Sequence, residues 1–292
     1  MTAIDTIRTQ DWQAIFSDDE KSLAIGGLES GNVVLLPELA FSLADNEEFI
    51  LRDPILSPKR KNISYNSLTQ QLGGVADDYC NNDTLKAFMA RYAKAAQQLV
   101  CALLPRYCDS LEIGRTSYRP AEIAGRASSP RKDDTRLHVD AFPSSPVAGK
   151  RILRVFCNIN PWHQPRVWHL GESFRQVADR FMPLISRPMS LQTGLMKLLH
   201  ITKGKRTPYD HYMLHIHDKM KCDETYQENV GKQRAEFLPG STWMVYTDLV
   251  SHAALSGSHL LEQTFYVPVS AMQNEALTPL RQLEAMCHRP LV

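Results

Sequence analysis

His138 and Asp140, in the segment DDTRLHVDAF, are spaced so that both side chains could bind one metal ion. The segment is predicted to be a strand, and side chains at positions i and i+2 of a strand project from the same face. Leu137 and Val139 should then point to the opposite side. A His-x-Asp pair alone is a weak signal, because a hydrogen-bonded histidine at a sheet edge followed by a turn aspartate has the same pattern.

The third ligand must come from another strand, and His252 is the best candidate. It lies in PGSTWMVYTDLVSHAALSG, just beyond a predicted strand that opens with a Pro-Gly turn. The alternative is that His252 caps a loop. Two histidines and one carboxylate on one face of the ion leave three positions open, which is the geometry of non-haem Fe(II) oxygenases. We therefore predict an Fe(II) site formed by His138, Asp140 and His252, with room for a co-substrate and O₂.

A second histidine cluster, in YDHYMLHIHDKMK, is a rival metal site. It contains His211, His215, His217 and Asp218, and the first two would share one face of a helix. A zinc site could be built from them, but neither a cysteine nor an HExxH pattern accompanies the cluster. We expect a surface or substrate-facing segment instead.

The distal carboxylate of 2-oxoglutarate would need a buried cationic partner. Many oxygenases of this class supply it shortly after the distal histidine, but residues 253–279 contain neither Lys nor Arg. The apolar strand RILRVFCNIN places Arg154 and Asn158 on one face. We predict that Arg154 binds the distal carboxylate and that Asn158 adds a hydrogen bond. The alternative is a structural ion pair at Arg154, since arginines in such strands are rarely unpaired.

The elements around these residues are mostly short strands, separated by turn clusters such as SSPRKDD, PSSPVAGK and LPGS. This pattern favours a sandwich or barrel, of which the double-sheet jelly roll is one form. The strand-like runs are residues 111–118, 135–141, 151–159, 241–247 and 260–269.

Upstream of the strands, apolar residues recur at helical spacing from Asp83, a predicted N-cap, to Pro105. We predict an α+β, mainly β fold in a single dioxygenase domain of residues 1–292, in which a jelly roll (double-stranded β-helix) forms the core. Its parts are a largely helical N-terminal scaffold at 1–109, the jelly-roll core at 110–270 and a C-terminal tail at 271–292. The apolar helix positions are Leu85, Phe88, Met89, Tyr92, Ala96, Leu99, Val100 and Leu103.

The composition sets limits on partners and location. The 33 basic residues nearly balance 32 acidic ones among 292, so no global field favours nucleic acid. The six cysteines form no CxxC pair, which favours reduced thiols in a cytoplasmic protein. The N-terminal MTAIDTIRTQDW lacks the apolar core of a secretory signal, and no run approaches the roughly 20 apolar residues of a membrane span. We expect at most peripheral contact with the inner membrane.

Read together, HVDAF, RVFCNINP and VSHAALSG…LEQTFYVPV resemble the Kdo hydroxylase family. Kdo is 3-deoxy-D-manno-oct-2-ulosonic acid. The resemblance extends over most of the chain, including SPKRKNISYN, and is strongest from about 110 to 270. It implies an Fe(II)-, 2-oxoglutarate- and O₂-dependent hydroxylase that acts on C3 of Kdo in Kdo-lipid A, during biosynthesis of the lipopolysaccharide inner core. The alternatives are a 2-oxoglutarate oxygenase for another small acid or lipid, and a non-catalytic jelly-roll binding protein.

The implied substrate carries carboxylate and phosphate groups, so local cations matter. Arg136 shares the predicted strand face with His138 and Asp140 and is expected to approach the substrate. Further predicted substrate-binding residues are Arg131 and Lys132, just before that strand, with Tyr118 and Arg119 as weaker candidates.

Other clusters are more often solvated surface runs than binding sites. They are Lys59, Arg60 and Lys61 in SPKRK, and Lys203, Lys205 and Arg206 in KGKR. Trp162 and Trp168 could stack on a sugar, although buried packing is the stronger expectation.

Overall fold

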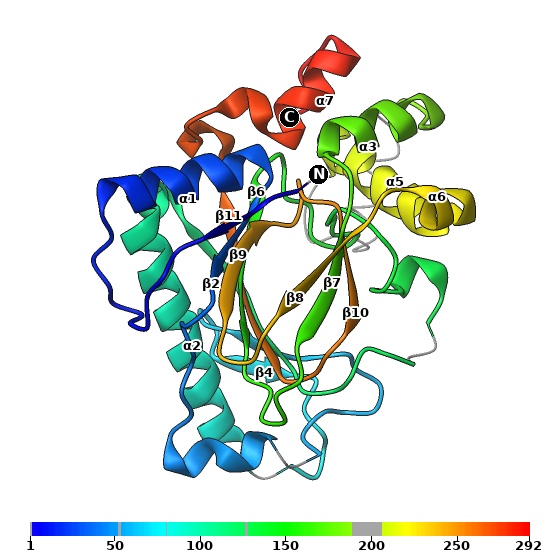
Figure 1. The fold of residues 1–292 in the computed structure, drawn as a ribbon. Coiled ribbons are helices and arrows are strands. Elements are labelled where there is room, and N and C mark those ends of the chain that lie inside the picture. The colour runs from blue at the N-terminus through cyan, green and yellow to red at the C-terminus, as the bar shows by residue number, and fades with distance from the viewer. Residues whose placement is uncertain (1, 52–53, 80, 126–127, 189–205) are drawn as a thin grey trace.

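The computed structural model describes residues 2–51, 54–79, 81–125, 128–188 and 206–292 (Figure 1). The strands are β1 (Ile4–Thr6), β2 (Val33–Leu36), β3 (Ile63–Asn66), β4 (Gln71–Gly73), β5 (Glu112–Arg119), β6 (Arg151–Asn158), β7 (Arg166–Leu170), β8 (Gln233–Phe237), β9 (Thr242–Tyr246), β10 (His252–Ser256) and β11 (Leu260–Val267). The α-helices are α1 (Asp18–Ser30), α2 (Asn82–Leu103), α3 (Phe174–Phe181), α5 (Pro208–Cys222), α6 (Glu224–Asn229) and α7 (Pro279–Cys287). Short 3₁₀ turns are η1 (Asp45–Leu51), η2 (Pro105–Ser110), η3 (Pro130–Lys132), η4 (Met182–Leu184), η5 (Val269–Ala271) and η6 (Glu275–Leu277).

These strands form two sheets. The larger has the order β1-β2-β9-β6-β11-β5-β3-β4, and the smaller has the order β10-β7-β8. Pairing is antiparallel throughout both, except between β1 and β2. Figure 1 shows β10, β7 and β8 lying across from β9, β6 and β11. The predicted jelly roll is confirmed.

Strand β6 shows how alternation divides the interior from the outer layer. Leu153 and Val155 join the core that includes residues of α1 and α2. Phe156, on the other face, packs with Trp168 and Trp243 between the two sheets. Arg154 shares the face of Phe156, so it points toward the interior, as the sequence predicts.

Helices α1 and α2 cover the outer face of the large sheet (Figure 1). Helix α2 starts at Asn82, and its N-cap is Asn81, two residues before the predicted N-cap Asp83. All the predicted apolar positions are buried. The description of residues 1–109 as largely helical is incomplete, because this part also supplies β1 to β4 at both edges of the large sheet.

The predicted strand at 135–141 is not a regular strand. His138 makes one isolated bridge with His252, through backbone hydrogen bonds of 3.0 and 2.9 Å. The next inward-facing amide, of Asp140, instead donates to the carbonyl of Thr247, ahead of β10. The ladder stops for that reason, although Leu137 and Val139 are buried in the main core as predicted.

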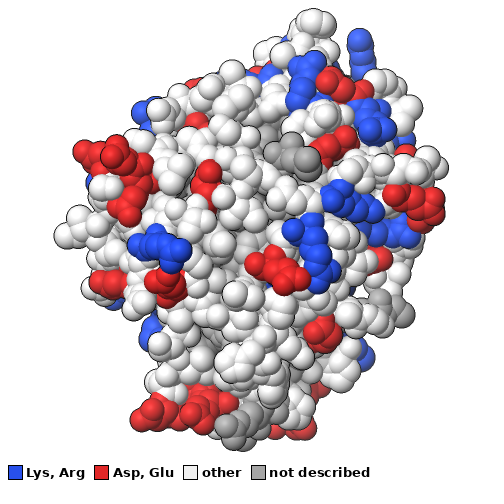
Figure 2. Space-filling view, in the orientation of Figure 1, with Lys and Arg blue, Asp and Glu red and all other residues white. Residues whose placement is uncertain are grey.

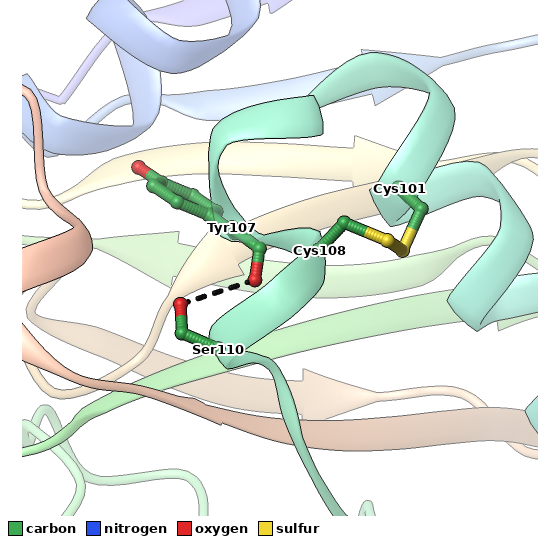
Figure 3. Close-up of a disulfide and its surroundings, with 4 residues drawn as sticks. All are labelled: Cys101, Tyr107, Cys108 and Ser110. Carbon is green, nitrogen blue, oxygen red and sulfur yellow. Dashed lines mark hydrogen bonds between the residues drawn. A yellow bond between two sulfur atoms is a disulfide. The ribbon is translucent and has the colours of Figure 1, made fainter.

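Cys101 and Cys108 form a disulfide between the last turn of α2 and η2 (Figure 3). The prediction that all cysteines are reduced thiols is therefore wrong for this pair. The turn at Pro105 folds the chain back, which brings the two Cα atoms within 4.9 Å. The same turn is closed by a hydrogen bond of 3.2 Å from the Ser110 hydroxyl to the Tyr107 carbonyl.

The chain between β7 and β8 contributes α3, α5 and α6, which lie together beside the small sheet (Figure 1). Helix α5 also contacts η3. Among the described residues, no helix has the length and apolar character needed to cross a membrane.

Candidate metal centre and its pocket

His138, Asp140 and His252 lie together and are buried. Their potential ligand atoms are all within 4.8 Å of one another, and the His138 Nε2 is 3.7 Å from the Asp140 Oδ1. Within the described ranges this is the only group of three or more His, Cys, Asp or Glu side chains with such a geometry. The bridge between residues 138 and 252 places the two histidines side by side, with ring centroids 4.6 Å apart.

Backbone carbonyls fix the orientation of both imidazoles. The Nδ1 of His138 is 2.8 Å from the Arg136 carbonyl, and the Nδ1 of His252 is 2.8 Å from the Val250 carbonyl. A carbonyl only accepts, so each Nδ1 carries the proton and each Nε2 keeps a free lone pair for a metal. The indole of Trp168 stacks on His252 at 5.1 Å and holds that ring from the side.

The electrostatics of the three groups match what a divalent metal requires. Burial lowers the pKa of His138 and of His252, so both imidazoles are neutral. Burial alone would raise the pKa of Asp140, but Arg154 and the two histidines outweigh it, so the net shift is downward and the carboxylate is ionised. Neutral imidazoles and an ionised carboxylate are the metal-binding protonation states. The donor set therefore fits Fe(II) with three open positions.

A pocket of about 400 Å³ opens over this centre. Seven Lys or Arg side chains line it against three Asp or Glu, one of which is Asp140. On the face of the molecule drawn in Figure 2, by contrast, basic side chains lie close to acidic ones. The pocket is therefore suited to anions. Its charged residues are Lys61, Arg119, Arg131, Lys132, Arg154, Arg166, Lys221, Asp134, Asp140 and Glu262.

Arg154 lies in the pocket but is already engaged. Its Nη2 is 2.9 Å from the Asp140 Oδ2, and its Nη1 is 3.0 Å from the Glu262 Oε1. Glu262 is also paired with Arg119 at 2.9 Å. The structural ion pair that the sequence analysis gave as the alternative for Arg154 is therefore present, and one of its partners is the candidate metal ligand Asp140.

The structure does not place Asn158, Tyr118 or Arg136 in the pocket lining. The side-chain amide of Asn158 donates to the carbonyls of Gln164 and Phe237, so it connects the end of β6 to the loop before β7 and to the end of β8. The Tyr118 side chain is buried in the core, and its hydroxyl donates to the Ile50 carbonyl.

Arg136 is turned away because residues around it do not form a strand, so the expected alternation fails. Its guanidinium pairs with Glu224 at 2.8 Å and donates to the Lys221 carbonyl at 3.0 Å. These contacts tie the segment before His138 to α5 and α6, and the substrate-binding role of Arg136 stays a prediction.

Other predicted cations lie at or near the pocket rim. Arg131 and Lys132 line it, as does Lys61, whose ammonium is 3.1 Å from Asp134. Arg206 donates to the carbonyl of Pro143, a pocket residue.

The remaining basic and aromatic candidates have other positions. Lys59 and Arg60 are exposed, and Lys203 and Lys205 lie outside the described residues. Trp168 is buried, as expected, whereas Trp162 is half-exposed.

The rival histidine cluster is divided by helix α5. His211 and His215 are on one side, with ring centroids 4.4 Å apart, and His211 contacts the Ser186 carbonyl. His217 instead lines the pocket, where its ring packs edge-on against His138 at 5.4 Å. His217 therefore faces the pocket, and the substrate-facing role of this segment stays a prediction.

Four charged pocket residues were not singled out from the sequence: Asp134, Arg166, Lys221 and Glu262. Arg166 and Glu262 are charged residues in mostly apolar strands, so the criterion that selected Arg154 would have found both. Lys221 follows His217 by one helical turn, but nothing local shows that this helix face meets the metal centre.

A jelly roll with two histidines and one carboxylate in a cationic pocket defines the class of non-haem Fe(II) oxygenases. The model of the family 3-deoxy-D-manno-oct-2-ulosonic acid (Kdo) hydroxylase matches residues 11–290. The chain belongs to the Kdo hydroxylase family.

Solved structures agree with this assignment. The Kdo hydroxylase KdoO, described as a non-haem Fe(II) α-ketoglutarate-dependent dioxygenase, in complex with α-ketoglutarate and Fe(III), is 44% identical with a TM-score of 0.95, over 100% of this chain and 98% of that one. Its cobalt(II) complex is 45% identical at the same TM-score and coverage. Its complex with succinate and Fe(III) is 44% identical with a TM-score of 0.94 and the same coverage. No curated protein sequence matches the chain.

Proposed function

We propose that this chain is an Fe(II)-, 2-oxoglutarate- and O₂-dependent hydroxylase of C3 in lipid-linked Kdo, with His138, Asp140 and His252 as metal ligands. The single observation that carries the proposal is the buried set of two neutral imidazoles and one carboxylate at the base of a cationic pocket. Family membership and the α-ketoglutarate complex of KdoO support the co-substrate.

Arg166 is a better candidate than Arg154 for the distal carboxylate of 2-oxoglutarate. Arg166 is 3% exposed at the start of β7, and its Nη1 donates to the Gly257 carbonyl at 2.7 Å. Its Nε finds no hydrogen-bond partner among the described residues. Burial, followed by the charge of Arg119, lowers the pKa of Arg166 to about 9.

A buried guanidinium that lacks an anion would be stabilised by a carboxylate placed beside it. The pocket that Arg166 shares with the metal ligands is also lined by Trp168 and Leu260, which could cover the methylene carbons of 2-oxoglutarate. The Nε of Arg154 likewise lacks a hydrogen-bond partner among the described residues, but carboxylates lie at both of its Nη atoms, so Arg154 has less capacity for a further anion. It instead holds Asp140 ionised and oriented.

Bound Fe(II) would supply the activation of O₂ that hydroxylation requires. The protein's own groups bind and orient: the carbonyls of Arg136 and Val250 hold the imidazole tautomers, and Arg154 holds the carboxylate. The buried walls exclude water from the reacting atoms.

The lipid-linked form of the substrate gives the rim residues a role. Lys132 and Arg131 lie at the pocket, and Arg131 is exposed with a side-chain fraction of 69%. Exposed cations at a pocket mouth could meet lipid phosphates while the sugar acid enters. Contact with the membrane would then be peripheral and weakened by salt.

Anaerobic reconstitution tests this function. The protein would be loaded with Fe(II) and 2-oxoglutarate, supplied with Kdo-lipid A and then exposed to air. We expect succinate and a core sugar that gains one oxygen at C3 by mass spectrometry and NMR. Succinate without oxygenated Kdo would indicate an oxygenase for another acid or lipid, and neither product would indicate a binding protein.

A further inference from the structure

Helix α5 brings two polar side chains to the metal pocket from outside the jelly roll. His217 and Lys221 are four residues apart, so they lie on the same helix face, and both line the pocket. The ring of His217 contacts that of His138, with centroids 5.4 Å apart. This face of α5 is therefore next to the metal ligands.

Lys221 is a buried cation with little compensation. Its side chain is 3% exposed, and its one ion pair among the described residues, to the Asp134 Oδ1, is long at 3.8 Å. Asp134 is also paired with Lys61 at the shorter distance of 3.1 Å. One carboxylate thus serves two ammonium groups, and burial lowers the pKa of Lys221 in spite of it.

The position of Lys221 is fixed by its backbone. The Arg136 guanidinium donates to the Lys221 carbonyl at 3.0 Å, and the Gln227 amide donates to the neighbouring Met220 carbonyl at 2.7 Å. These bonds tie the last turn of α5 to the segment before His138 and to α6. The backbone of Lys221 is consequently fixed, and its buried side chain lines the metal pocket.

The chemistry of Kdo requires a cation close to the metal. Its name places the carboxylate at C1 and the methylene at C3, so the carboxylate carbon is two bonds from the carbon to be hydroxylated. When C3 approaches the metal, the carboxylate must lie within a few ångströms of it. Exposed Arg131 belongs to the rim instead, and Arg154 is held by two carboxylates.

We propose that Lys221 binds the carboxylate of the sugar acid and thereby positions its C3 over the metal centre. The inference rests on the proposed hydroxylation of Kdo, and it assigns the specificity for a sugar acid to helix α5. The Asp134 Oδ1 is 3.8 Å from the Lys221 ammonium, which is too far for a strong hydrogen bond. The ammonium can therefore donate to the carboxylate of the substrate and keep its contact with Asp134.

Lys221→Met tests the inference, since it keeps most of the length of the side chain and removes its charge. With a methyl glycoside of Kdo as substrate, we expect the KM for the sugar to rise about ten- to hundredfold, the usual range for a hydrogen bond to a charged group. The KM for 2-oxoglutarate should stay within about twofold. Succinate formed per oxygenated sugar should increase, because a misplaced C3 uncouples the two products. Lys221→Arg should recover part of the affinity.

Lys219→Met is the matched control, because Lys219 is on the same helix turn but does not line the pocket. It should leave both KM values and the coupling unchanged. If Lys221→Met lowers thermal stability, a second measurement compares the glycoside with an analogue in which a carboxamide replaces the carboxylate. Wild-type protein should discriminate strongly between carboxylate and carboxamide, and Lys221→Met or Lys221→Arg should do so less.

Equal discrimination in wild type and Lys221→Met would overturn the assignment, as would a variant that raises only the KM for 2-oxoglutarate. Absence of Kdo oxygenation by the wild-type protein would instead contradict the proposed function itself. The two failures are thus distinguishable.

Discussion

The Arg154 Nη2 lies 2.9 Å from the Oδ2 of Asp140, so the metal-binding carboxylate has a buried cation as its constant neighbour. The same guanidinium meets Glu262 through Nη1. Arg154 thereby joins the metal centre to the adjacent strand β11. The positive charge of Arg154 lowers the pKa of Asp140 and so favours the ionised carboxylate.

Arg154→Met should destabilise the metal-free protein by about 3–5 kcal/mol, the typical cost of breaking a buried ion pair. Asp140 and Glu262 would lose their shared cation. Bound Co(II) should restore part of the loss, because the metal compensates Asp140. Chemical denaturation with and without Co(II) measures both effects. Unchanged stability together with a steep rise in the KM for 2-oxoglutarate would favour the sequence-based role of Arg154 as the co-substrate anchor.

Arg166→Met should raise the KM for 2-oxoglutarate about ten- to hundredfold, because a charged hydrogen bond of the distal carboxylate is lost. Fe(II) affinity should change little. Arg166→Lys should recover only part, since an ammonium lacks the planar fork of a guanidinium. Arg234→Met is the control, because Arg234 is an exposed arginine in the same small sheet that pairs with Glu236. Steady-state kinetics at varied 2-oxoglutarate concentration measure this KM. If Arg166→Met has the KM of the wild type, Arg166 does not bind the distal carboxylate.

Replacement of any metal ligand should abolish both turnover and metal binding. His138→Ala, Asp140→Ala and His252→Ala each remove one of the three donors. Anaerobic titration with Fe(II), with circular dichroism to confirm folding, is the measurement. His215→Ala, on the far side of α5, should bind iron normally. If one of these three variants binds Fe(II) with wild-type affinity, the residue replaced in it is not a metal ligand.

The metal-free protein should lose stability as the pH falls below about 6.5. Both His138 and His252 have pKa values below the ordinary 6.5 because they are buried. The unfolded chain therefore takes up protons between the ordinary and the lowered values, whereas the folded chain does not. The contribution of the two histidines to the free energy of unfolding is present above about pH 6.5, and it is lost as the pH falls from there toward their lowered pKa values. Thermal unfolding from pH 8 to pH 5 should show the decline.

The double variant His138→Asn and His252→Asn is the comparison for this pH series. It should flatten the dependence, because the two buried bases are gone. An equally steep decline in the double variant would assign the effect to other histidines.

Because Cys101 and Cys108 form a disulfide, neither residue should be alkylated when the chain is unfolded without a reductant. Reduction should then lower the free energy of unfolding by about 2–3 kcal/mol, since the closed loop is short. Peptide mass spectrometry after alkylation, before and after reduction, gives the pairing. Alkylation of both residues without a reductant would show that the thiols are free in solution.

Much of the fold and the metal site was predictable because the governing interactions are local. Alternation in β6 directed Arg154 inward, and helical spacing marked the buried face of α2. The ligand types and the His-x-Asp spacing selected His138 and Asp140, and the jelly roll requires a distant partner strand to supply His252.

The sequence by itself thus determined the element types, the jelly-roll core and the three candidate ligands, since spacing and donor chemistry are properties of short segments. Only the tertiary structure decided which cations face the ligands. Arg136 turns away because its segment pairs with β10 at a single bridge, and Lys221 enters because α5 packs back over the pocket. A charge in a helix or strand meets its partner through contacts between distant segments, and these depend on how whole layers pack.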